Sequence, residues 1–207
     1  GTHRNGGVLV VFGDDHAGKS SSIGHQSDPA LAANSIPVLF PATIQEYLDF
    51  GLHGIAMSRF ASVVVGFKCV NETVTATATV AVDSDRVSIN LPQGMPVPEG
   101  GIHIRPEYDP LGQDERMVRY KLPRILAYAR NNRLDRVAFG SSRPTKLGIV
   151  TSGKAYLDST AALHQLGIDD AKARALGIGL YKVAMVWPLE PEGLKAFAAN
   201  CEELLFV

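Results

Sequence analysis

The chain alternates short apolar runs with longer segments in which apolar residues recur every three to four positions. Short β-branched runs bounded by glycine or proline are typical of buried strands, whereas the second pattern predicts amphipathic helices. The runs that predict strands are residues 8–12, 37–40, 62–67, 136–139, 147–150, 181–186 and 204–207. A Thr-rich alternation over 73–82, continued at 87–89, predicts a half-exposed strand.

The clearest helix prediction covers residues 43–60, where Thr43 followed three residues later by Glu46 forms a capping box. A second helix is predicted over 114–131, with a break or kink near Pro123 because proline lacks the N–H that a helix needs. Further helices are predicted at 155–166, 169–176 and 191–200. Strands that alternate with helices predict βαβ crossovers, and therefore an α/β fold on a parallel sheet.

The alternation restarts after residues 141–146, which are the best candidate for a linker. We therefore expect one unit over 1–140 and a second over 147–207. An apolar run follows the first residues closely and another forms the last ones, whereas chain ends normally carry polar residues. On this pattern we interpret the sequence as a window from a longer protein.

Charge and cysteine content narrow the possible functions. The 207 residues include 20 Lys and Arg against 21 Asp and Glu, which gives a formal net charge of −1. This balance offers no electrostatic reason for binding nucleic acid or an anionic membrane. Cys69 and Cys201 lie far apart in sequence, which argues against a disulfide scaffold or a Cys-rich metal site within this chain. Such cysteine usage predicts a reducing, cytoplasmic compartment.

Residues 13–20, Gly-Asp-Asp-His-Ala-Gly-Lys-Ser, match the phosphate-binding P-loop pattern and follow an apolar run. Two adjacent carboxylates inside such a loop would repel a polyphosphate. A P-loop also needs a long helix after it, whereas Gly24 and Pro29 interrupt the following residues. No later strand ends in an Asp that clearly suits magnesium. A P-loop nucleotide-binding protein is therefore the alternative and not the leading interpretation.

Acidic, basic and imidazole side chains nevertheless gather in this loop, at the strand end where α/β proteins bind ligands. The candidates for a functional loop are Asp14, Asp15, His16, Lys19, Ser20 and His25. The competing interpretations are a buried polar network that satisfies the loop, a metal site of carboxylates and imidazoles whose spacing fits no known pattern, and a serine nucleophile. Elsewhere, His53 is expected to be partly buried or exposed, and Arg59 and Lys68 are expected to be surface charges.

Three groups of runs, taken together and in order, resemble one family. The first opens with Gly-Gly-Val-Leu-Val-Val-Phe-Gly-Asp-Asp-His. The groups are residues 6–16 with 19–21 and 25–27; 45–54 with 56–60 and 65–68; and 147–154 with 156–158, 181–183 and 185–193. They resemble the indolepyruvate ferredoxin oxidoreductases, especially the long fused bacterial form.

The resemblance implies a thiamine-diphosphate enzyme of the 2-oxoacid:ferredoxin oxidoreductase group. Such enzymes convert aryl 2-oxoacids, coenzyme A and oxidised ferredoxin to acyl-CoA, CO₂ and reduced ferredoxin, with Mg²⁺ and 4Fe-4S clusters in the complete protein. It further implies the rear part of a pyrimidine-binding-type domain over 1–140 and the start of a transketolase-C-terminal-like domain over 147–207. The Gly-Asp-Gly motif and the Cys clusters of the family do not occur in this sequence. The acid and base groups are therefore expected outside this chain, which alone is expected to be inactive.

The resemblance also assigns candidate contacts. Arg4 is the candidate to pair with the carboxylate of a 2-oxoacid. The six loop residues named above are expected to line the cofactor pocket or the subunit contact that completes it, and no residue is assigned a catalytic or metal-binding role. The expected partners are ferredoxin, coenzyme A, the aryl 2-oxoacid, the rest of the same chain and further copies in a homo-oligomer. A non-catalytic interaction domain with the same fold is the other alternative.

Overall fold

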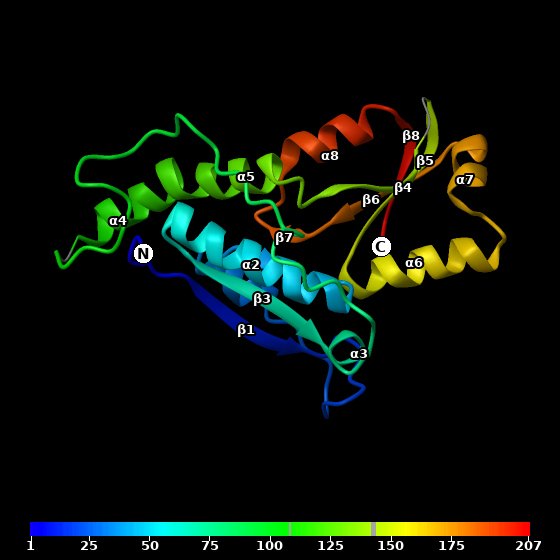
Figure 1. The fold of residues 1–207 in the computed structure, drawn as a ribbon, viewed down its shortest axis with the longest axis horizontal. Coiled ribbons are helices and arrows are strands. Elements are labelled where there is room, and N and C mark those ends of the chain that lie inside the picture. Colours follow the sequence, from blue (N-terminus) through cyan, green and yellow to red (C-terminus); the bar gives the residue numbers. More distant parts are fainter. Residues whose placement is uncertain (108, 142–143) are drawn as a thin grey trace.

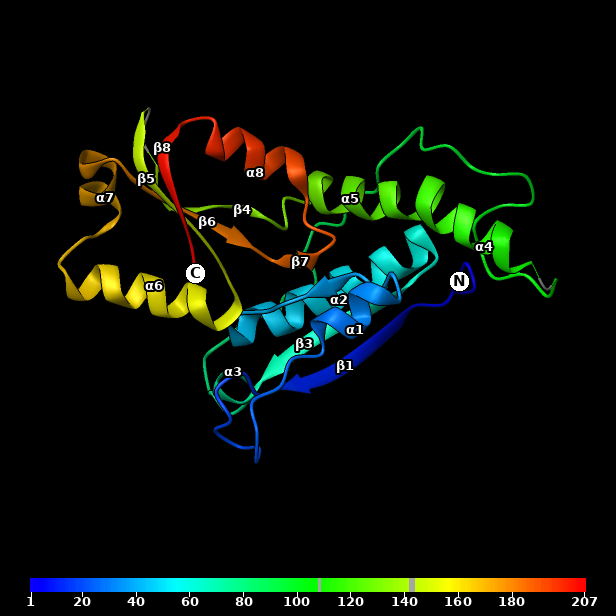
Figure 2. The same ribbon diagram turned by 180° about the vertical axis from the view of Figure 1, so that it is seen from behind.

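The computed structural model describes residues 1–107, 109–141 and 144–207. Within these residues the fold is mixed α/β, with two four-stranded sheets and helices packed against them (Figures 1 and 2). The strands are β1 (Val8–Asp14), β2 (Val38–Leu39), β3 (Val64–Val70), β4 (Arg136–Gly140), β5 (Thr145–Ser152), β6 (Ile178–Val183), β7 (Met185–Trp187) and β8 (Cys201–Phe206). The α-helices are α1 (Asp28–Ala33), α2 (Ile44–Ala61), α3 (Asn71–Val74), α4 (Pro110–Arg116), α5 (Leu122–Asn131), α6 (Gly153–Gln165), α7 (Asp170–Leu176) and α8 (Pro191–Ala198).

The first sheet has the strand order β1-β3-β2-β7. Its first three strands are parallel, and β7 runs antiparallel to β2. Helix α2 packs between this sheet and α5 (Figure 1). The shared core contains Leu39, Phe50, Met57, Val65, Phe67, Ile125 and Tyr128. His53 is buried at the edge of this core with its Nδ1 3.1 Å from the Tyr128 hydroxyl, so it is less accessible than expected.

Strand β1 lies at the edge of this sheet and pairs with β3 among the described strands. Val8, Val10 and Val11 are 40%, 39% and 66% exposed. The apolar run correctly predicts a strand, but its predicted burial is wrong within the described residues. The reason is that a strand with a neighbour on one side and little cover on its faces keeps much of its surface in water.

The second sheet has the order β4-β6-β5-β8, with β5, β6 and β8 parallel and β4 antiparallel. Helices α8 and α6 lie on opposite faces of this sheet (Figure 1). Phe197 packs on one face, and Leu163 packs on the other. The predicted α/β class with parallel strands is therefore confirmed, and antiparallel strands at one edge of each sheet add to it.

The proposed domain division stays a prediction. The predicted linker 141–146 includes residues 142 and 143, which lie outside the described residues. β4, which ends just before this linker, pairs with β6 in the second sheet, while β7 returns to the first sheet. If two domains are present, β4 lies with the second one.

The predicted long helix near Pro123 consists of three pieces. α4 is followed by a π-helical turn, η1 (Met117–Lys121), and then by α5. The Leu122 N–H donates to the carbonyl of Met117, five residues earlier. Because Pro123 has no N–H to donate, the helix tolerates a change of hydrogen-bond pattern at this point. The prediction of an interruption is confirmed.

One local prediction is wrong. Residues 73–82 and 87–89 do not form a strand, since α3 begins at Asn71 and irregular chain follows it. The Thr73 hydroxyl donates to the carbonyl of Val70 and lies 2.7 Å from the Tyr47 hydroxyl, which anchors this turn. In addition, the short helix α1 lies where no helix or strand was predicted. The α2 cap is as predicted at Thr43, whose Oγ1 accepts the Glu46 N–H at 3.2 Å.

The Glu46 carboxylate links the two sheets. Its Oε1 accepts from Lys182 of β6 and lies 3.3 Å from Arg136 of β4, while its Oε2 accepts the Ala42 N–H at 2.8 Å. Lys182 is fully buried, and its Nζ lies 4.5 Å from the centre of the Tyr156 ring. Burial lowers the pKa of Lys182, and the charge of Glu46 opposes that shift. A carboxylate of α2 therefore provides the counter-charge for an ammonium group in the other sheet.

Asp135 holds the chain where it passes from β6 to β7. Its Oδ1 accepts the N–H groups of Ala184 and Met185, at 2.7 and 3.0 Å. Its Oδ2 is buried without a partner among the described residues. Burial raises the pKa of Asp135 to about 6, from a usual value of 3.8.

Asp135→Asn is expected to remove a pH dependence of stability. The folded state holds the Asp135 proton more tightly than the unfolded state, so this group lowers stability as the pH rises from about 4 to about 6. The difference is up to about 3 kcal/mol. Urea unfolding at pH 4.5 and 7.5 measures about 2 kcal/mol of this difference, with Asp114→Asn on exposed α4 as the control. Equal pH dependence in wild type and Asp135→Asn would contradict the prediction.

Within the described residues, no helix is both long enough and apolar enough to cross a bilayer.

Candidate functional site

The loop that follows β1 is organised around the buried carboxylate of Asp14. This carboxylate accepts from the backbone N–H and the hydroxyl of Ser27, at 3.0 and 2.7 Å. Lys68 Nζ, His25 Nδ1 and His16 Nε2 lie 3.4, 3.5 and 3.9 Å from its oxygens. Burial alone would raise the pKa of Asp14, but the Ser27 hydrogen bonds and the Lys68 charge outweigh it and lower the pKa. Asp14 is therefore a fixed anion that holds both ends of the loop.

The Asp15 carboxylate occupies a nest of backbone N–H groups. Oδ1 accepts from the Lys19 N–H at 2.9 Å, and Oδ2 accepts from the N–H groups of Ser20 and Ser21 at 2.6 and 2.8 Å. The hydrogen bonds from Ser20 and Lys19 hold the pKa of Asp15 well below its usual range. Gly18, with φ of +64°, provides the left-handed turn that this wrapping requires.

This nest argues against the P-loop interpretation. The amides at Lys19 and Ser20, which would cradle a phosphate in a P-loop, hold a carboxylate of the same loop instead. Residues 18–27 are bends and irregular chain with an isolated bridge at His25, and the helix dipole that a P-loop uses is therefore missing there. The match to the P-loop pattern therefore does not correspond to a free phosphate site.

Lys68, expected at the surface, is buried and completes this network. It is 3% exposed, and its Nζ hydrogen-bonds the Asp28 carboxylate and lies 3.4 Å from Asp14. The ammonium also lies 4.9 Å from the centre of the Phe40 ring. The sequence contained a signal that was missed, because a lysine inside an apolar parallel strand needs a buried counter-charge.

The Lys68 ammonium also argues against a metal ion in this network. Ligand atoms of Asp14, His16 and Asp28 lie within 4.8 Å of one another. Lys68 already contacts both carboxylates and supplies their positive charge. A divalent cation in this place would have to displace the buried ammonium. The cluster is therefore better explained as an ion-pair network than as a metal centre.

The remaining predicted residues lie at the surface of the loop. His16, Lys19, Ser20 and His25 all keep part of their surface in water, and Lys19 Nζ lies 3.4 Å from Glu72 of α3. A cavity of about 360 Å³ separates this region from the start of α6. It is lined by His16, Ala17, Val70, Glu72, Lys154, Ala155 and Asp158. The predicted loop residues thus divide into two buried carboxylates and four side chains available for contact.

Arg4 lies apart from this loop, at the opposite end of β1. It is exposed in a turn, which is anchored by the buried Thr2. The Thr2 N–H donates to the Ser62 hydroxyl at 3.0 Å, and its own hydroxyl donates to the Ser58 carbonyl. Arg59, expected at the surface, is exposed and donates to the Gly6 carbonyl. The described structure therefore does not bring Arg4 together with the other predicted residues.

The C-terminal part of the chain is similar to a known protein family. Residues 136–207 match the family model described as the indolepyruvate oxidoreductase domain. This segment is similar to that domain family. The match includes β4 and all of the second sheet, and it supports the resemblance inferred from the sequence. No curated protein matches the chain.

Solved structures resemble the whole chain. A 2-oxoglutarate:ferredoxin oxidoreductase from Magnetococcus marinus, solved with 2-oxoglutarate, coenzyme A and succinyl-CoA bound, matches with a TM-score of 0.61 and 16% identity. The match covers 96% of this chain and 40% of that one. A split-gene transketolase, an inactive beta4 tetramer, gives a TM-score of 0.49 at 12% identity, covering 97% of this chain and 47% of that one. This chain therefore spans less than half of either structure. The likeness to the 2-oxoglutarate:ferredoxin oxidoreductase shows a shared fold, and the match of residues 136–207 supports the resemblance to the 2-oxoacid:ferredoxin oxidoreductases.

Proposed function

We propose that this chain works as part of an enzyme that oxidatively decarboxylates aryl 2-oxoacids of the indolepyruvate type. The products are acyl-CoA and CO₂, and two electrons pass through 4Fe-4S clusters to ferredoxin. The observation that carries the proposal is the match of residues 136–207 to the indolepyruvate oxidoreductase domain. The relative with bound 2-oxoglutarate, coenzyme A and succinyl-CoA supports the same reaction class.

The cofactor of the proposed enzyme is thiamine diphosphate with Mg²⁺, which supplies the electron sink for decarboxylation when bound. The loop after β1 does not fit its diphosphate, because Asp15 fills the nest of N–H groups there. We infer that the diphosphate, Mg²⁺ and the clusters are held mainly by other parts of the enzyme. The two cysteines described here lie in different sheets, on β3 and β8.

The proposed role of this chain is to form one wall of the active site. His16, Lys19, Ser20 and His25 would contact the cofactor pocket or the subunit that completes it, because they are the accessible members of the loop. Asp14 and Asp15 would act indirectly, by holding the loop in place through the contacts described above. We further propose that the enzyme is a cytoplasmic homo-oligomer. The chain alone is expected to be inactive.

Arg4 is proposed to pair with the carboxylate of the 2-oxoacid. It is exposed, and a guanidinium can hold a carboxylate through two parallel hydrogen bonds. Loss of such a contact weakens substrate binding without removing the groups that perform the chemistry.

The test is an assay of the complete enzyme with indolepyruvate or 2-oxoglutarate, coenzyme A and oxidised ferredoxin. We expect turnover of indolepyruvate in preference to 2-oxoglutarate. Arg4→Gln should raise the KM for indolepyruvate by about tenfold or more, with a smaller change in kcat. Arg174→Gln on α7 is the matched control. Preference for 2-oxoglutarate would refute the aryl specificity, and absence of 2-oxoacid oxidation would refute the proposed function.

A further inference from the structure

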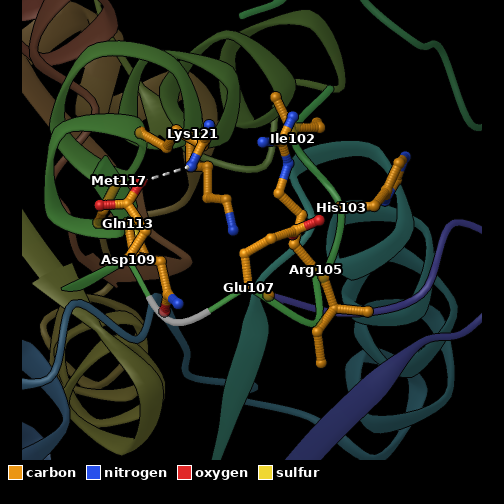
Figure 3. A pocket seen from close by; sticks show the side chains of 11 residues that line it. Ile102, His103, Arg105, Glu107, Asp109, Gln113, Met117 and Lys121 are labelled. Carbon is orange, nitrogen blue, oxygen red and sulfur yellow. Dashed lines mark ion pairs between the residues drawn. The ribbon is translucent and has the colours of Figure 1, made fainter. Parts of the chain in front are cut away.

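A second cavity, of about 140 Å³, lies between the 102–107 segment and the helices α4 and η1 (Figure 3). Its charged lining is His103, Arg105, Glu107, Asp109, Arg116 and Lys121. Lys121 is 6% exposed and extends toward the 102–107 segment, whereas the carboxylate-bearing residues are exposed. The more deeply buried charges of this cavity are therefore cationic.

Two buried polar atoms of this lining have no partner among the described residues, Nδ1 of His103 and Nε of Arg116. The Arg116 guanidinium has one long contact, with Nη1 3.7 Å from Asp109 Oδ2. Asp109 itself caps α4 by accepting the Gly112 N–H at 2.9 Å. Because buried polar groups are normally hydrogen-bonded, these two atoms leave an acceptor and a donor position open to a bound molecule in the cavity.

The protonation of His103 restricts what that ligand is. Burial lowers the pKa of His103, a hydrogen bond to the Thr2 backbone opposes this, and the charges of Lys121, His3 and Arg4 lower it further. His103 is therefore neutral near pH 7. Nδ1 has no partner among the described residues, so in the neutral imidazole with its hydrogen on Nε2 this atom presents a lone pair to the cavity. The ligand must offer a hydroxyl donor to His103 and an anionic oxygen to Arg116.

We propose that this cavity binds a phosphate group that carries one proton. Its ionised oxygen accepts from Arg116, its P–OH donates to His103 Nδ1, and the Lys121 ammonium adds favourable charge. A phosphate has a second pKa near 6, so forms with a hydroxyl are available at neutral pH. An ionised carboxylate or a sulfate lacks that hydroxyl. The cavity exceeds the roughly 30 Å³ of a water molecule several-fold, which leaves room for a phosphate. This inference does not depend on the proposed function.

Calorimetric titration of the protein at pH 7 with inorganic phosphate, sulfate and glycerol 3-phosphate tests the inference. We expect one phosphate site with a Kd of about 1 mM or tighter. We expect sulfate to bind at least about tenfold more weakly than phosphate. Binding of inorganic phosphate or of glycerol 3-phosphate supports the site, and their ratio distinguishes free phosphate from an ester. Binding of neither, or equal binding of sulfate, overturns it.

Matched variants locate the binding. Arg116→Gln should weaken phosphate binding by about tenfold or more, because Arg116 is the proposed donor. Arg119→Gln, an exposed arginine on η1, should change it by less than about twofold. Equal losses in the two variants would overturn the assignment.

A measurement on the unaltered protein covers the case in which Arg116→Gln does not fold. The imidazole NMR signals of His103 should shift on addition of phosphate, and those of His164 on α6 should not. Unchanged His103 signals at saturating phosphate would overturn the inference.

Discussion

Replacing Glu46 by Gln is expected to lower the free energy of unfolding by about 3–5 kcal/mol, since it leaves a buried ammonium without its counter-charge. Lys182 is fully buried, and its ammonium donates a hydrogen bond to Glu46. The aromatic rings of Phe50 and Tyr156 near its Nζ provide only partial compensation. Urea unfolding followed by circular dichroism measures the loss.

Two further variants separate the buried pair from its neighbour. Arg136 also contacts Glu46, but its side chain is 45% exposed, so Arg136→Gln should cost no more than about 1 kcal/mol. The double variant Glu46→Gln/Lys182→Met should recover most of the loss, because it removes both buried charges. Equal losses in the free energy of unfolding for Glu46→Gln and Arg136→Gln would show that the buried Glu46–Lys182 pair stabilises the fold no more than the exposed contact does.

Lys68→Met is expected to cost about 3–5 kcal/mol for the corresponding reason in the loop after β1. Asp14 has a fully buried side chain, and the substitution would leave its carboxylate without the Lys68 ammonium. Asp28 would lose the same partner. The loop loses the Lys68 contacts but keeps the Ser27 hydrogen bonds to Asp14. We therefore expect the loop to become more mobile at a lower urea concentration than the one at which the sheet unfolds. Urea unfolding, combined with hydrogen exchange of residues 14–28, measures both effects.

The pH dependence gives an independent check of the Lys68 prediction. The pKa of Asp14 is lowered in the folded protein, so the stability it contributes is present above its unfolded value of 3.8 and is lost as the pH falls through the lower folded pKa. Without Lys68 the folded pKa should rise, and stability should begin to fall at higher pH. Asp14→Asn in the Lys68→Met background should restore part of the stability. Lys154→Met, a half-exposed lysine of α6, is the matched control and should cost little. An unchanged acid limb in Lys68→Met would contradict the argument.

The two largest effects both involve lysines inside apolar strands. Phe67 and Val70 around Lys68, and Tyr181 and Val183 around Lys182, are buried. Neither lysine was assigned a partner from the sequence, although a lysine in such a setting requires one. What the pattern did not indicate was which of the 21 acidic residues provides it.

The sequence was sufficient for the elements whose causes are local. Apolar periodicity and the Thr43 cap predicted α2, because the 3.6-residue period and the first-turn hydrogen bonds are set by neighbours in the chain. Proline chemistry predicted the interruption at Pro123 for the same reason. The family resemblance, supported over residues 136–207, came from long runs of residue identities.

The candidate loop was only partly predictable. The cluster after β1 was recognised because charged and imidazole residues follow an apolar strand. That Asp15 fills the nest of a P-loop-like sequence could not be read from the pattern, since a phosphate and a carboxylate satisfy the same N–H groups. The contacts of Arg4 and the four accessible loop residues with substrate and cofactor stay predictions.

By itself the sequence determined most strands and helices, the α/β class and the likeness to the 2-oxoacid:ferredoxin oxidoreductases. Only the tertiary structure decided that β1 lies at an edge, that β7 crosses to the first sheet, and that Glu46 pairs with Lys182 at a separation of 136 residues. The physical reason is that backbone geometry fixes the period of an element within a few residues. The pairing of buried charged side chains depends on how the elements pack and exclude water. It is therefore determined only when the whole chain is folded.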